Sequence, residues 1–477
     1  MISGLYLITD DNRDGYILTK VKKALTGGAR IIQYRAKDID VNERRAIATQ
    51  LQTLCREHQA LLIINDFPEL ARDIDADGVH LGQDDMSVVQ ARQIIGRNKL
   101  IGISTHSVDE ALKAEAQGAD YIAFGSVFPT STKKDITLVG LKSLSMVRKA
   151  VLIPLVAIGG MTPERASSAI DAGADAIAVI SGVMADDDPG RAAREFALLF
   201  NRHLPLPKGK VMTIAGSDSG GGAGIQADIK TITLLGSYAT SVLTALTAQN
   251  TLGVKEVYSI HTNFVEQQLD AVLDDIGTDT IKTGMLNWGG SVWRIAQIIE
   301  ERALLAVVDP VMVAKGGASL LDDVALDSLI SRLLPQAYLL TPNLPEVAAI
   351  TGINPRNSEE MIEAGRNLQM LGARNVLIKG GHLEQGDATD VLLLDEEEHL
   401  ITAPRIDSPN THGTGCSLAA AIATFLAQGY PLKQAVERAK RFISIAIEHA
   451  VPIGHGHGPI NHFHAAMQLL HEKAPMD

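Results

Sequence analysis

The sequence predicts an α/β protein with two domains, a (β/α)₈ barrel followed by a three-layer α/β domain with a mostly parallel sheet. Three observations support this prediction. The chain has 477 residues, which is too long for one ordinary hydrophobic core. Its first part repeats a short β-rich run followed by a helical stretch, which is typical of parallel sheets. Pro205 and Pro207 then interrupt the repeat, and a less regular series of strands and helices follows.

Eight β-rich runs in the first part predict the strands of the barrel. They lie at residues 5–10, 30–38, 61–66, 77–85, 100–107, 120–128, 154–160 and 175–183. Eight repeats of a strand and a helix within about 200 residues are typical of a compact (β/α)₈ barrel.

The segment NRHLPLPKGKV, residues 201–211, predicts the domain boundary. Its two prolines end a helix near REFALLF, and VMTIAGS then begins a new strand. We therefore expect the barrel to span residues 1–204, a linker residues 205–210, and the second domain residues 211–477.

The second domain is predicted from strands interleaved with helices. The strand at residues 211–217 leads through a glycine-rich loop into a helix at residues 224–236. Further strands are expected at residues 279–285, 304–312, 337–343 and 376–382, and residues 389–395 and 399–406 are typical of a β-ribbon.

Composition excludes several functional classes. Forty-three basic against 56 acidic residues give a net charge of −13, which disfavours nucleic acid or a membrane surface as a partner. The two cysteines, Cys55 and Cys416, form no disulfide framework and suit a reducing compartment. The N-terminus is not typical of a signal peptide, and we find no apolar run long enough to span a membrane. We expect a cytoplasmic protein with small-molecule partners; whether it is a homo-oligomer is left open.

Polar residues gather at the C-terminal ends of the predicted barrel strands, which lie on one rim, where active sites sit. Gln33, Arg35 and Lys37 alternate along one strand, so their side chains are expected on one side. An amide, an arginine and a lysine can together bind a diphosphate, although a solvated strand edge would carry the same residues. The other residues expected at this rim are Asn65, Asp66, Asp85, Ser104, Thr130, Thr132, Lys133 and Gly160.

Asp66 and Asp85 end consecutive predicted strands, so their carboxylates can meet above the rim. Two carboxylates facing a diphosphate commonly hold Mg²⁺, which shares phosphate oxygens and keeps several waters. The alternatives are two unrelated surface aspartates, or Asp84 in place of Asp85.

FPTSTKKD follows the sixth predicted strand, and its hydroxyls and Lys133 suit a phosphate. AIGG and VISG follow strands seven and eight, the place where such barrels bind phosphate through backbone N–H groups.

The motifs QYRAKD, IIND, DGVHLGQDD, GIST, FPTSTKKD and AIGGMTPE, in this order, closely resemble those of thiamine-phosphate synthases. The resemblance covers essentially the whole first part. It implies an enzyme that joins 4-amino-2-methyl-5-(diphosphooxymethyl)pyrimidine to 4-methyl-5-(2-phosphooxyethyl)thiazole and releases diphosphate. The C–O bond to diphosphate would break first, which requires cations such as Lys133 around the leaving group rather than a general base.

The same resemblance implies three sets of site residues. The pyrimidine diphosphate would contact Gln33, Arg35, Lys37, Asn65, Ser104 and Lys133. The thiazole phosphate would lie against Thr130, Ser131, Thr132, Gly160, Ile180 and Ser181. Mg²⁺ would be bound by Asp66 and Asp85.

The second part carries AGSDSGGGAGIQAD, TALTAQNT, IKTGM, VVDPVMVAKGG, LTPNLPE, VLIKGGH and THGTGC. The glycine-rich turn alone is weak evidence, and its spacing is neither that of a Walker loop nor that of a dinucleotide-binding loop. Together, however, the motifs resemble hydroxymethylpyrimidine/phosphomethylpyrimidine kinases from about Val211 onward. This resemblance implies a ribokinase-like fold, ATP as co-substrate and Mg²⁺.

In this resemblance, GTGC is an anion hole in which the N–H groups of Gly413, Thr414, Gly415 and Cys416 face the migrating phosphoryl group. Related sugar kinases usually carry an aspartate base where Cys416 stands. We expect the helix end and a nearby metal to lower the pKa of this thiol, so that it can serve as the base. The alternative is a small buried cysteine at a helix start.

Further kinase residues follow from the resemblance. Gly216, Asp228, Gln249 and Met285 would line the pyrimidine pocket, and Asn343, Glu346 and Lys379 would lie at the ATP phosphates. Asp309 is a candidate near metal or phosphate, with strand capping as its alternative. The family commonly has a proline after GSD, where this chain has Ser219, and we expect its absence to loosen the loop.

The two resemblances belong to one pathway and predict a bifunctional thiamine-biosynthesis enzyme. Two alternatives stay open. The barrel could be a non-catalytic phosphate-binding or oligomerising module beside an active kinase, or the kinase could act on pyridoxal-type alcohols.

Overall fold

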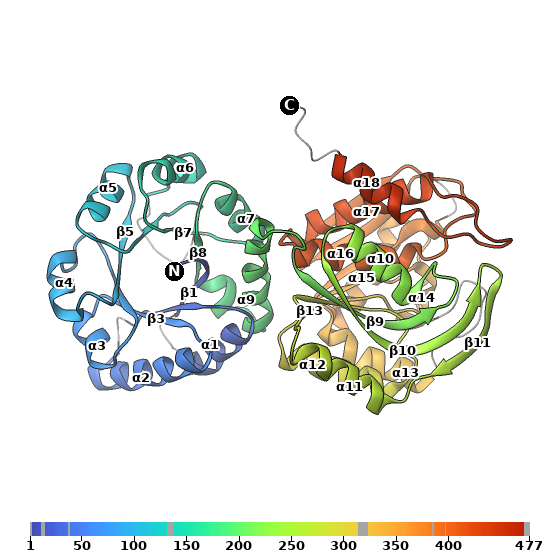
Figure 1. Ribbon diagram of the computed structural model, residues 1–477, viewed down its shortest axis with the longest axis horizontal. Coiled ribbons are helices and arrows are strands. Elements are labelled where there is room, and N and C mark those ends of the chain that lie inside the picture. The colour runs from blue at the N-terminus through green and yellow to red at the C-terminus, as the bar shows by residue number, and fades with distance from the viewer. Residues whose placement is uncertain are drawn as a thin grey trace. The chain divides into compact units, whose positions relative to one another are not determined.

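The structure is a computed structural model that describes residues 2–10, 15–36, 39–130, 137–312, 323–383, 386–395 and 397–471. The chain forms two compact units, Met1–Phe200 and Asn201–Asp477 (Figure 1). The short 3-10 helix η1, Leu199–His203, spans the change from one unit to the other. In the part of the chain that is described, no helix combines the length and apolar character needed to cross a membrane.

The N-terminal unit is a closed barrel of eight parallel strands, and each of the eight predicted strands is confirmed. The strands pair in chain order, and β1 closes the barrel against β8. Their bounds are β1 Gly4–Ile8, β2 Ile31–Tyr34, β3 Leu61–Asn65, β4 Gly78–Leu81, β5 Leu100–Thr105, β6 Tyr121–Phe124, β7 Leu155–Ile158 and β8 Ala176–Val179.

Helices surround this barrel (Figure 1). They are α1 Ile17–Thr26, α2 Val41–Glu57, α3 Pro68–Asp73, α4 Val88–Ile95, α5 Val108–Ala116, α6 Gly140–Ala150, α7 Pro163–Asp171, α8 Ser181–Met184 and α9 Pro189–Leu198. Local sequence fixes their starts: Asp40 caps α2, Ser107 caps α5, and Ser87 forms a capping box at α4.

Strand residues of the barrel alternate between two apolar cores. Leu5 and Leu7 of β1 point outward and pack with the helices, whereas Tyr6 and Ile8 belong to a smaller cluster inside the barrel. Because side chains fill the barrel, ligands can reach only its ends, and the polar residues that follow the strands decide the chemistry.

The second unit contains one nine-stranded sheet of order β11-β10-β9-β12-β13-β14-β15-β16-β17. The six strands from β10 to β15 run parallel, and β11, β16 and β17 pair antiparallel with their neighbours. The predicted strands and the β-ribbon are confirmed. Bounds are β9 Lys210–Asp218, β10 Tyr238–Asn250, β11 Gly253–Ser259, β12 Thr280–Thr283, β13 Leu305–Val308, β14 Leu339–Leu340, β15 Asn375–Ile378, β16 Ala388–Leu394 and β17 Glu397–Ala403.

Helices cover both faces of this sheet, which gives the predicted three layers. They are α10 Gly224–Leu234, α11 Thr262–Leu273, α12 Gly289–Glu301, α13 Asp323–Ser328, α14 Leu344–Thr351, α15 Ser358–Met370, α16 Thr414–Ala427, α17 Leu432–Glu448 and α18 His462–His471, with short turns η2 Leu329–Leu333, η3 Leu334–Gln336 and η4 Gly380–His382. Helix α16 is apolar almost all round and buries Ser417 through Ala427, because it packs between the sheet and helices α10 and α17.

Candidate active sites

Strand β2, which carries Gln33, ends one residue later, at Tyr34, so Arg35 lies just beyond the strand. Gln33 is buried and points into the barrel, where its Nε2 donates to the Tyr6 hydroxyl at 3.0 Å. Arg35 is fixed through its backbone: its N–H donates to Thr9 Oγ1 at 3.0 Å, and the Thr9 hydroxyl donates to the Arg35 carbonyl at 3.3 Å. Lys37 lies outside the described residues.

Two carboxylates follow neighbouring barrel strands. Asp66 comes directly after β3 with φ of 63°, and its N–H donates to the His80 carbonyl of β4. Asp85 lies in the loop after β4, where its Oδ2 accepts from the Gly82 N–H at 2.6 Å. Among the residues that the structure covers, no cluster of three or more metal-ligating side chains occurs. Mg²⁺ is commonly held by one or two carboxylates together with substrate phosphates, so this pair fits the ion.

The loops after β6 and β7 are in direct contact. Val127 and Phe128 donate their N–H groups to the carbonyls of Ile158 and Gly159. A Cβ on Gly160 would lie 2.2 Å from the Pro129 carbonyl oxygen, so only glycine permits this approach. Thr130, which follows Pro129, and Gly160 therefore lie on adjoining loops.

The remaining barrel residues lie where their strands end. Asn65 ends β3, Ser104 lies near the end of β5, Ile180 follows β8, and Ser181 begins α8. Ser131, Thr132 and Lys133 lie outside the described residues, so their place at this rim stays a prediction.

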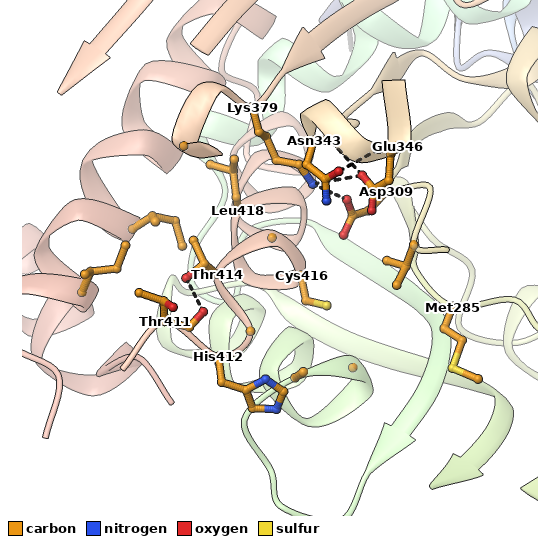
Figure 2. A pocket seen from close by; sticks show the side chains of 18 of the residues that line it. Met285, Asp309, Asn343, Glu346, Lys379, Thr411, His412, Thr414, Cys416 and Leu418 are labelled. Carbon is orange, nitrogen blue, oxygen red and sulfur yellow. Dashed lines mark hydrogen bonds and ion pairs between the residues drawn. The ribbon is translucent and has the colours of Figure 1, made fainter. Parts of the chain in front are cut away.

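The second unit contains a cavity of about 820 Å³ above the carboxyl ends of its parallel strands (Figure 2). Residues from many predicted motifs line it. They include Gly216, Gln249, Met285, Asp309, Asn343, Glu346, Lys379, Gly413, Thr414, Gly415 and Cys416.

One end of this cavity carries a charged cluster (Figure 2). Lys379, which follows β15, pairs with Asp309, which follows β13, at 2.7 Å, and lies 3.9 Å from Glu346. Asn343 and Glu346 form a capping box at the start of α14. Although burial alone would lower it, the neighbouring Asp309 and Glu346 carboxylates raise the pKa of Lys379, which keeps this amine charged. Lys379 is therefore a largely buried, paired cation rather than a lysine exposed to solvent.

Glu346→Gln is expected to remove a pH-dependent loss of stability. Burial raises the pKa of Glu346 to about 7, with Lys379 opposing and Asp309 adding to the shift. Since this pKa lies above that of an unfolded glutamate, the native state binds more protons, and the free energy of unfolding falls as pH rises through about 4.5 to 7. Urea unfolding of the kinase unit at pH 5 and pH 8 measures this fall. An equal fall in the wild type and in Glu346→Gln would contradict the assignment.

The glycine-rich segment before α16 is shaped by close backbone contacts. Gly413 has φ of 80°, and a Cβ there would lie 1.8 Å from the Gly222 carbonyl oxygen. The Thr414 N–H donates to Thr411 within the loop at 3.4 Å, so it is not aimed at a ligand in the way we expected. Gly415 and Cys416 lie in the first helical turn, where N–H groups have no acceptor within the helix. A Cβ on Gly415 would lie 3.4 Å from Lys379 Nζ, which places this cation beside the helix N-terminus.

The helix end does not lower the pKa of Cys416, contrary to expectation; the effect expected of a nearby metal stays a prediction. Burial raises the pKa of the thiol to about 11, and the charges of Asp228 and Asp309 add to the shift. The Lys282 ammonium and an N–H of Gly224 act in the opposite direction but do not outweigh burial.

Asp228 does not line the cavity, contrary to expectation. It is fully buried on α10, where its Oδ2 pairs with Lys282 Nζ at 2.8 Å and accepts from the Thr213 hydroxyl at 2.6 Å. Although burial alone would lower it, the Asp228 carboxylate raises the pKa of Lys282. This pair lies behind the cavity wall and acts on Cys416 through its charges.

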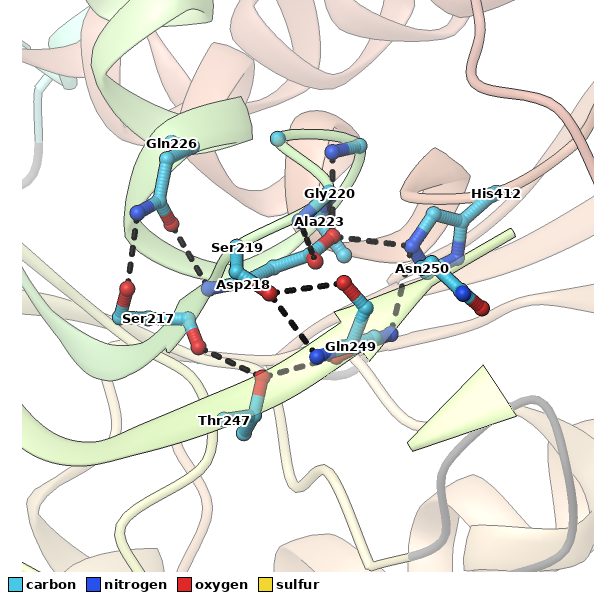
Figure 3. Close-up of polar contacts among 12 residues, drawn as sticks. Ser217, Asp218, Ser219, Gly220, Ala223, Gln226, Thr247, Gln249, Asn250 and His412 are labelled. Atoms are coloured by element: carbon cyan, nitrogen blue, oxygen red, sulfur yellow. Dashed lines mark hydrogen bonds and ion pairs between the residues drawn. The ribbon is translucent and has the colours of Figure 1, made fainter. Parts of the chain in front are cut away.

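Asp218 organises the glycine-rich loop (Figure 3). Its carboxylate accepts N–H bonds from Gly220, Gly222 and Ala223 at 2.8 to 3.0 Å, and His412 Nε2 approaches its Oδ2 at 3.0 Å. The contact joins this loop to the segment before α16.

Ser219, which stands where we expected a missing proline to loosen the loop, makes two hydrogen bonds. Its hydroxyl donates to the Gln249 carbonyl at 2.7 Å and accepts from the Gln249 N–H at 2.9 Å (Figure 3). These two hydrogen bonds attach the loop to the end of β10 at Gln249, which is predicted to line the pyrimidine pocket.

Sequence reasoning missed several cavity residues. Asp218 and His412 lie within two of the predicted motifs, which do not indicate their contact, and Asp390 and Lys440, which pair at 2.7 Å on the cavity wall, lie in no predicted motif. Each of these pairs joins segments that are far apart in the sequence, so only correlated substitutions among homologous sequences could have indicated them.

Known proteins resemble both units. A thiamine monophosphate synthase family model matches residues 5–183, and a phosphomethylpyrimidine kinase model matches residues 218–461. The thiamine biosynthesis bifunctional protein ThiED of Geobacter sulfurreducens is 53% identical over 467 residues, covering 98% of this chain and 95% of that protein.

Two further relatives match the second unit. The hydroxymethylpyrimidine/phosphomethylpyrimidine kinase of Escherichia coli is 48% identical over 258 residues, covering 53% of this chain and 97% of that protein. The solved ADP complex of Bacillus subtilis pyridoxal kinase has a TM-score of 0.50 and 37% identity, covering 55% of this chain and 99% of that one.

Proposed function

This chain belongs to the family of bifunctional thiamine-biosynthesis proteins, and on that premise we propose how its two sites divide the chemistry. The kinase unit transfers phosphoryl groups from ATP to hydroxymethylpyrimidine and then to its monophosphate. The barrel joins the resulting diphosphate to thiazole phosphate and releases diphosphate. The observation that carries this proposal is the match of both family models, one per unit, within a single chain.

In the kinase unit, Lys379 and the first-turn N–H groups of Gly415 and Cys416 bind the transferring phosphoryl group. The 3.4 Å spacing between Lys379 Nζ and a Cβ position at Gly415 supports this role. The substrate hydroxyl transfers its proton to the thiolate form of Cys416 while its oxygen attacks the γ-phosphorus of ATP, and ADP leaves. Gly216, Gln249 and Met285 hold the pyrimidine ring.

Mg²⁺ fits both sites. In the kinase unit, the Asp309 and Glu346 carboxylates lie in one buried region beside Lys379, and burial together with the Asp309 charge raises the pKa of Glu346. A divalent cation would favour the charged form of both carboxylates. In the barrel, Asp66 and Asp85 would hold the ion. When bound, Mg²⁺ supplies charge stabilisation to phosphate oxygens.

In the barrel, Gln33, Arg35, Lys37, Asn65, Ser104 and Lys133 bind the pyrimidine diphosphate. The cations stabilise the negative charge that develops on the departing diphosphate as the C–O bond breaks. The thiazole phosphate is bound by the loops that carry Thr130, Ser131, Thr132, Gly160, Ile180 and Ser181. The contact between the loops after β6 and β7 supports a shared phosphate site.

The test supplies hydroxymethylpyrimidine, thiazole phosphate, ATP and Mg²⁺ to the full chain and measures thiamine phosphate, diphosphate and ADP. We expect one diphosphate and two ADP for each thiamine phosphate. A second reaction replaces hydroxymethylpyrimidine and ATP by the pyrimidine diphosphate and tests the barrel alone. ADP in the first reaction, with no thiamine phosphate in either reaction, would favour the non-catalytic barrel instead.

A second substrate class for the kinase is favoured by the 37% identity to a pyridoxal kinase. Pyridoxal carries a hydroxymethyl group on an aromatic nitrogen ring, so the same cavity can accept it. Turnover with the two alcohols, measured at equal concentration, decides between them.

A further inference from the structure

Five polar side chains form a continuous hydrogen-bonded chain inside the barrel. Gln33 Nε2 donates to the Tyr6 hydroxyl at 3.0 Å, and the hydroxyls of Tyr6 and Tyr121 lie 2.8 Å apart. The Tyr121 hydroxyl lies 3.1 Å from His80 Nδ1, and His80 Nε2 lies 3.0 Å from Ser104 Oγ. The chain therefore begins and ends at two residues that we place at the pyrimidine diphosphate.

The three middle members are held away from solvent. Tyr6 and Tyr121 are at most 1% exposed and His80 is 6% exposed. Both nitrogens of His80 lie within hydrogen-bond distance of hydroxyl groups rather than of a carboxylate, and burial disfavours a charged ring, so the ring is neutral. A neutral ring has one donor and one acceptor nitrogen.

The hydrogen bonds that link these five side chains all donate in one direction, from Gln33 toward Ser104. Tyr6 accepts from the Gln33 amide, so its own hydrogen is left for Tyr121. Tyr121 then donates to His80 Nδ1, and the ring hydrogen must be on Nε2, which donates to Ser104. The hydrogen of the Ser104 hydroxyl is therefore left to point elsewhere, and the chain as described offers it no other partner. The opposite direction would leave the buried Tyr6 hydrogen without an acceptor unless the Gln33 amide turned over.

The barrel makes room for this chain. A Cβ on Gly102 would lie 2.0 Å from the Tyr121 ring, so glycine at this position of β5 permits the ring to reach His80. The rings of Tyr6 and His80 lie 6.0 and 5.6 Å from that of Tyr121. Tyr6, Tyr121 and His80 lie within β1, β6 and β4, whereas most of the predicted synthase site residues lie at or after the ends of strands.

We propose that Tyr6, Tyr121 and His80 are positioning residues of the synthase site, which fix the Gln33 amide and make the Ser104 hydroxyl a hydrogen-bond donor toward the pyrimidine diphosphate. The inference rests on the proposed placing of Gln33 and Ser104 at that substrate. These hydrogen bonds couple the contacts that Gln33 and Ser104 make with the substrate. If the Gln33 amide rotated by 180°, every hydrogen bond in the series would reverse its direction, and Ser104 would change from a donor to an acceptor toward the substrate. A ligand with the wrong pattern of donors and acceptors would therefore be disfavoured at both ends together.

The first test is the tautomer of His80 in the wild-type protein. In ¹⁵N-histidine-labelled full chain, with His80 assigned by loss of its signals in His80→Gln, we expect the Nε2–H form to exceed the Nδ1–H form at least about tenfold. A predominant Nδ1–H form would overturn the direction of the chain. This measurement needs neither activity nor a hydroxyl-deletion variant that folds.

The second test removes single hydroxyls. Tyr6→Phe and Tyr121→Phe are expected to lower synthase kcat/KM for the pyrimidine diphosphate about tenfold, with KM for thiazole phosphate changed less than about twofold. Tyr34→Phe is the matched control, because Tyr34 is equally buried on β2 and its hydroxyl has no hydrogen-bond partner among the described residues. Kinase turnover of the same variants reports that the second unit is intact, and the Tyr34→Phe control reports the effect of removing a buried hydroxyl from the barrel.

The third test asks whether the two ends are coupled. Tyr6 and Ser104 are separated by two intervening side chains, so independent effects would multiply. If the chain couples them, Tyr6→Phe costs clearly less than tenfold when Ser104 is already alanine. Losses in Tyr6→Phe and Tyr121→Phe equal to that in Tyr34→Phe would refute the proposal while the wild type remains active. An inactive wild-type barrel would instead refute the proposed synthase function.

Discussion

Replacing Asp66 by asparagine is expected to lower synthase turnover by about a thousandfold, because it removes a carboxylate ligand for the ion that stabilises the departing diphosphate, a contribution of several kcal/mol. Asparagine is the informative change, since Asp66 has φ of 63° and asparagine adopts this conformation readily. Alanine would add about 1 kcal/mol of backbone strain and confuse folding with chemistry. Synthase kcat at saturating Mg²⁺ and substrates is the measurement.

Asp75→Asn is the matched control for this prediction. Asp75 is also a barrel aspartate with positive φ, 56°, but its carboxylate pairs with Arg56 and Lys99 on the outside. We expect it to leave synthase turnover unchanged, and we expect kinase turnover to be unchanged in both variants. Wild-type synthase turnover in Asp66→Asn would show that Asp66 is not a ligand of the ion.

Cys416→Ala is expected to lower kinase kcat by about a hundredfold to a thousandfold, the usual effect of removing a general base. The pH dependence tests the role more directly. Since burial raises the pKa of Cys416 to about 11, the thiolate fraction of the free enzyme rises about tenfold per pH unit below that value. Kinase kcat/KM, which reports the free enzyme, should therefore rise steadily between pH 7 and pH 9.

Cys416→Asp provides the contrasting variant, because a carboxylate is ionised throughout this range and the rise should be lost. Cys55→Ala is the matched control, since Cys55 is the other cysteine of the chain and is buried in the barrel. A flat wild-type profile, together with full turnover in Cys416→Ala, would leave Cys416 as a small buried residue at a helix start.

Sequence reasoning was most successful where local pattern and topology act together. All eight barrel strands and the β-ribbon are confirmed, because alternating strands and helices leave few arrangements for a parallel sheet. The kinase residues Asp309, Asn343 and Lys379 each follow a parallel strand, so their motif positions already placed them at one edge of the sheet.

The sequence alone determined the two folds, the family resemblance and most residues that follow the strands, because these depend on periodicity and on the order of motifs along the chain. Only the tertiary structure decided that Asp228 pairs with the buried Lys282, that Cys416 has a raised pKa, and that two tyrosines and a histidine link Gln33 on β2 to Ser104 on β5 inside the barrel. Ion pairing, pKa and hydrogen-bond direction depend on burial and on distances between segments far apart in the chain. Neither the burial of a side chain nor its distance to a remote segment can be read from a local stretch of residues.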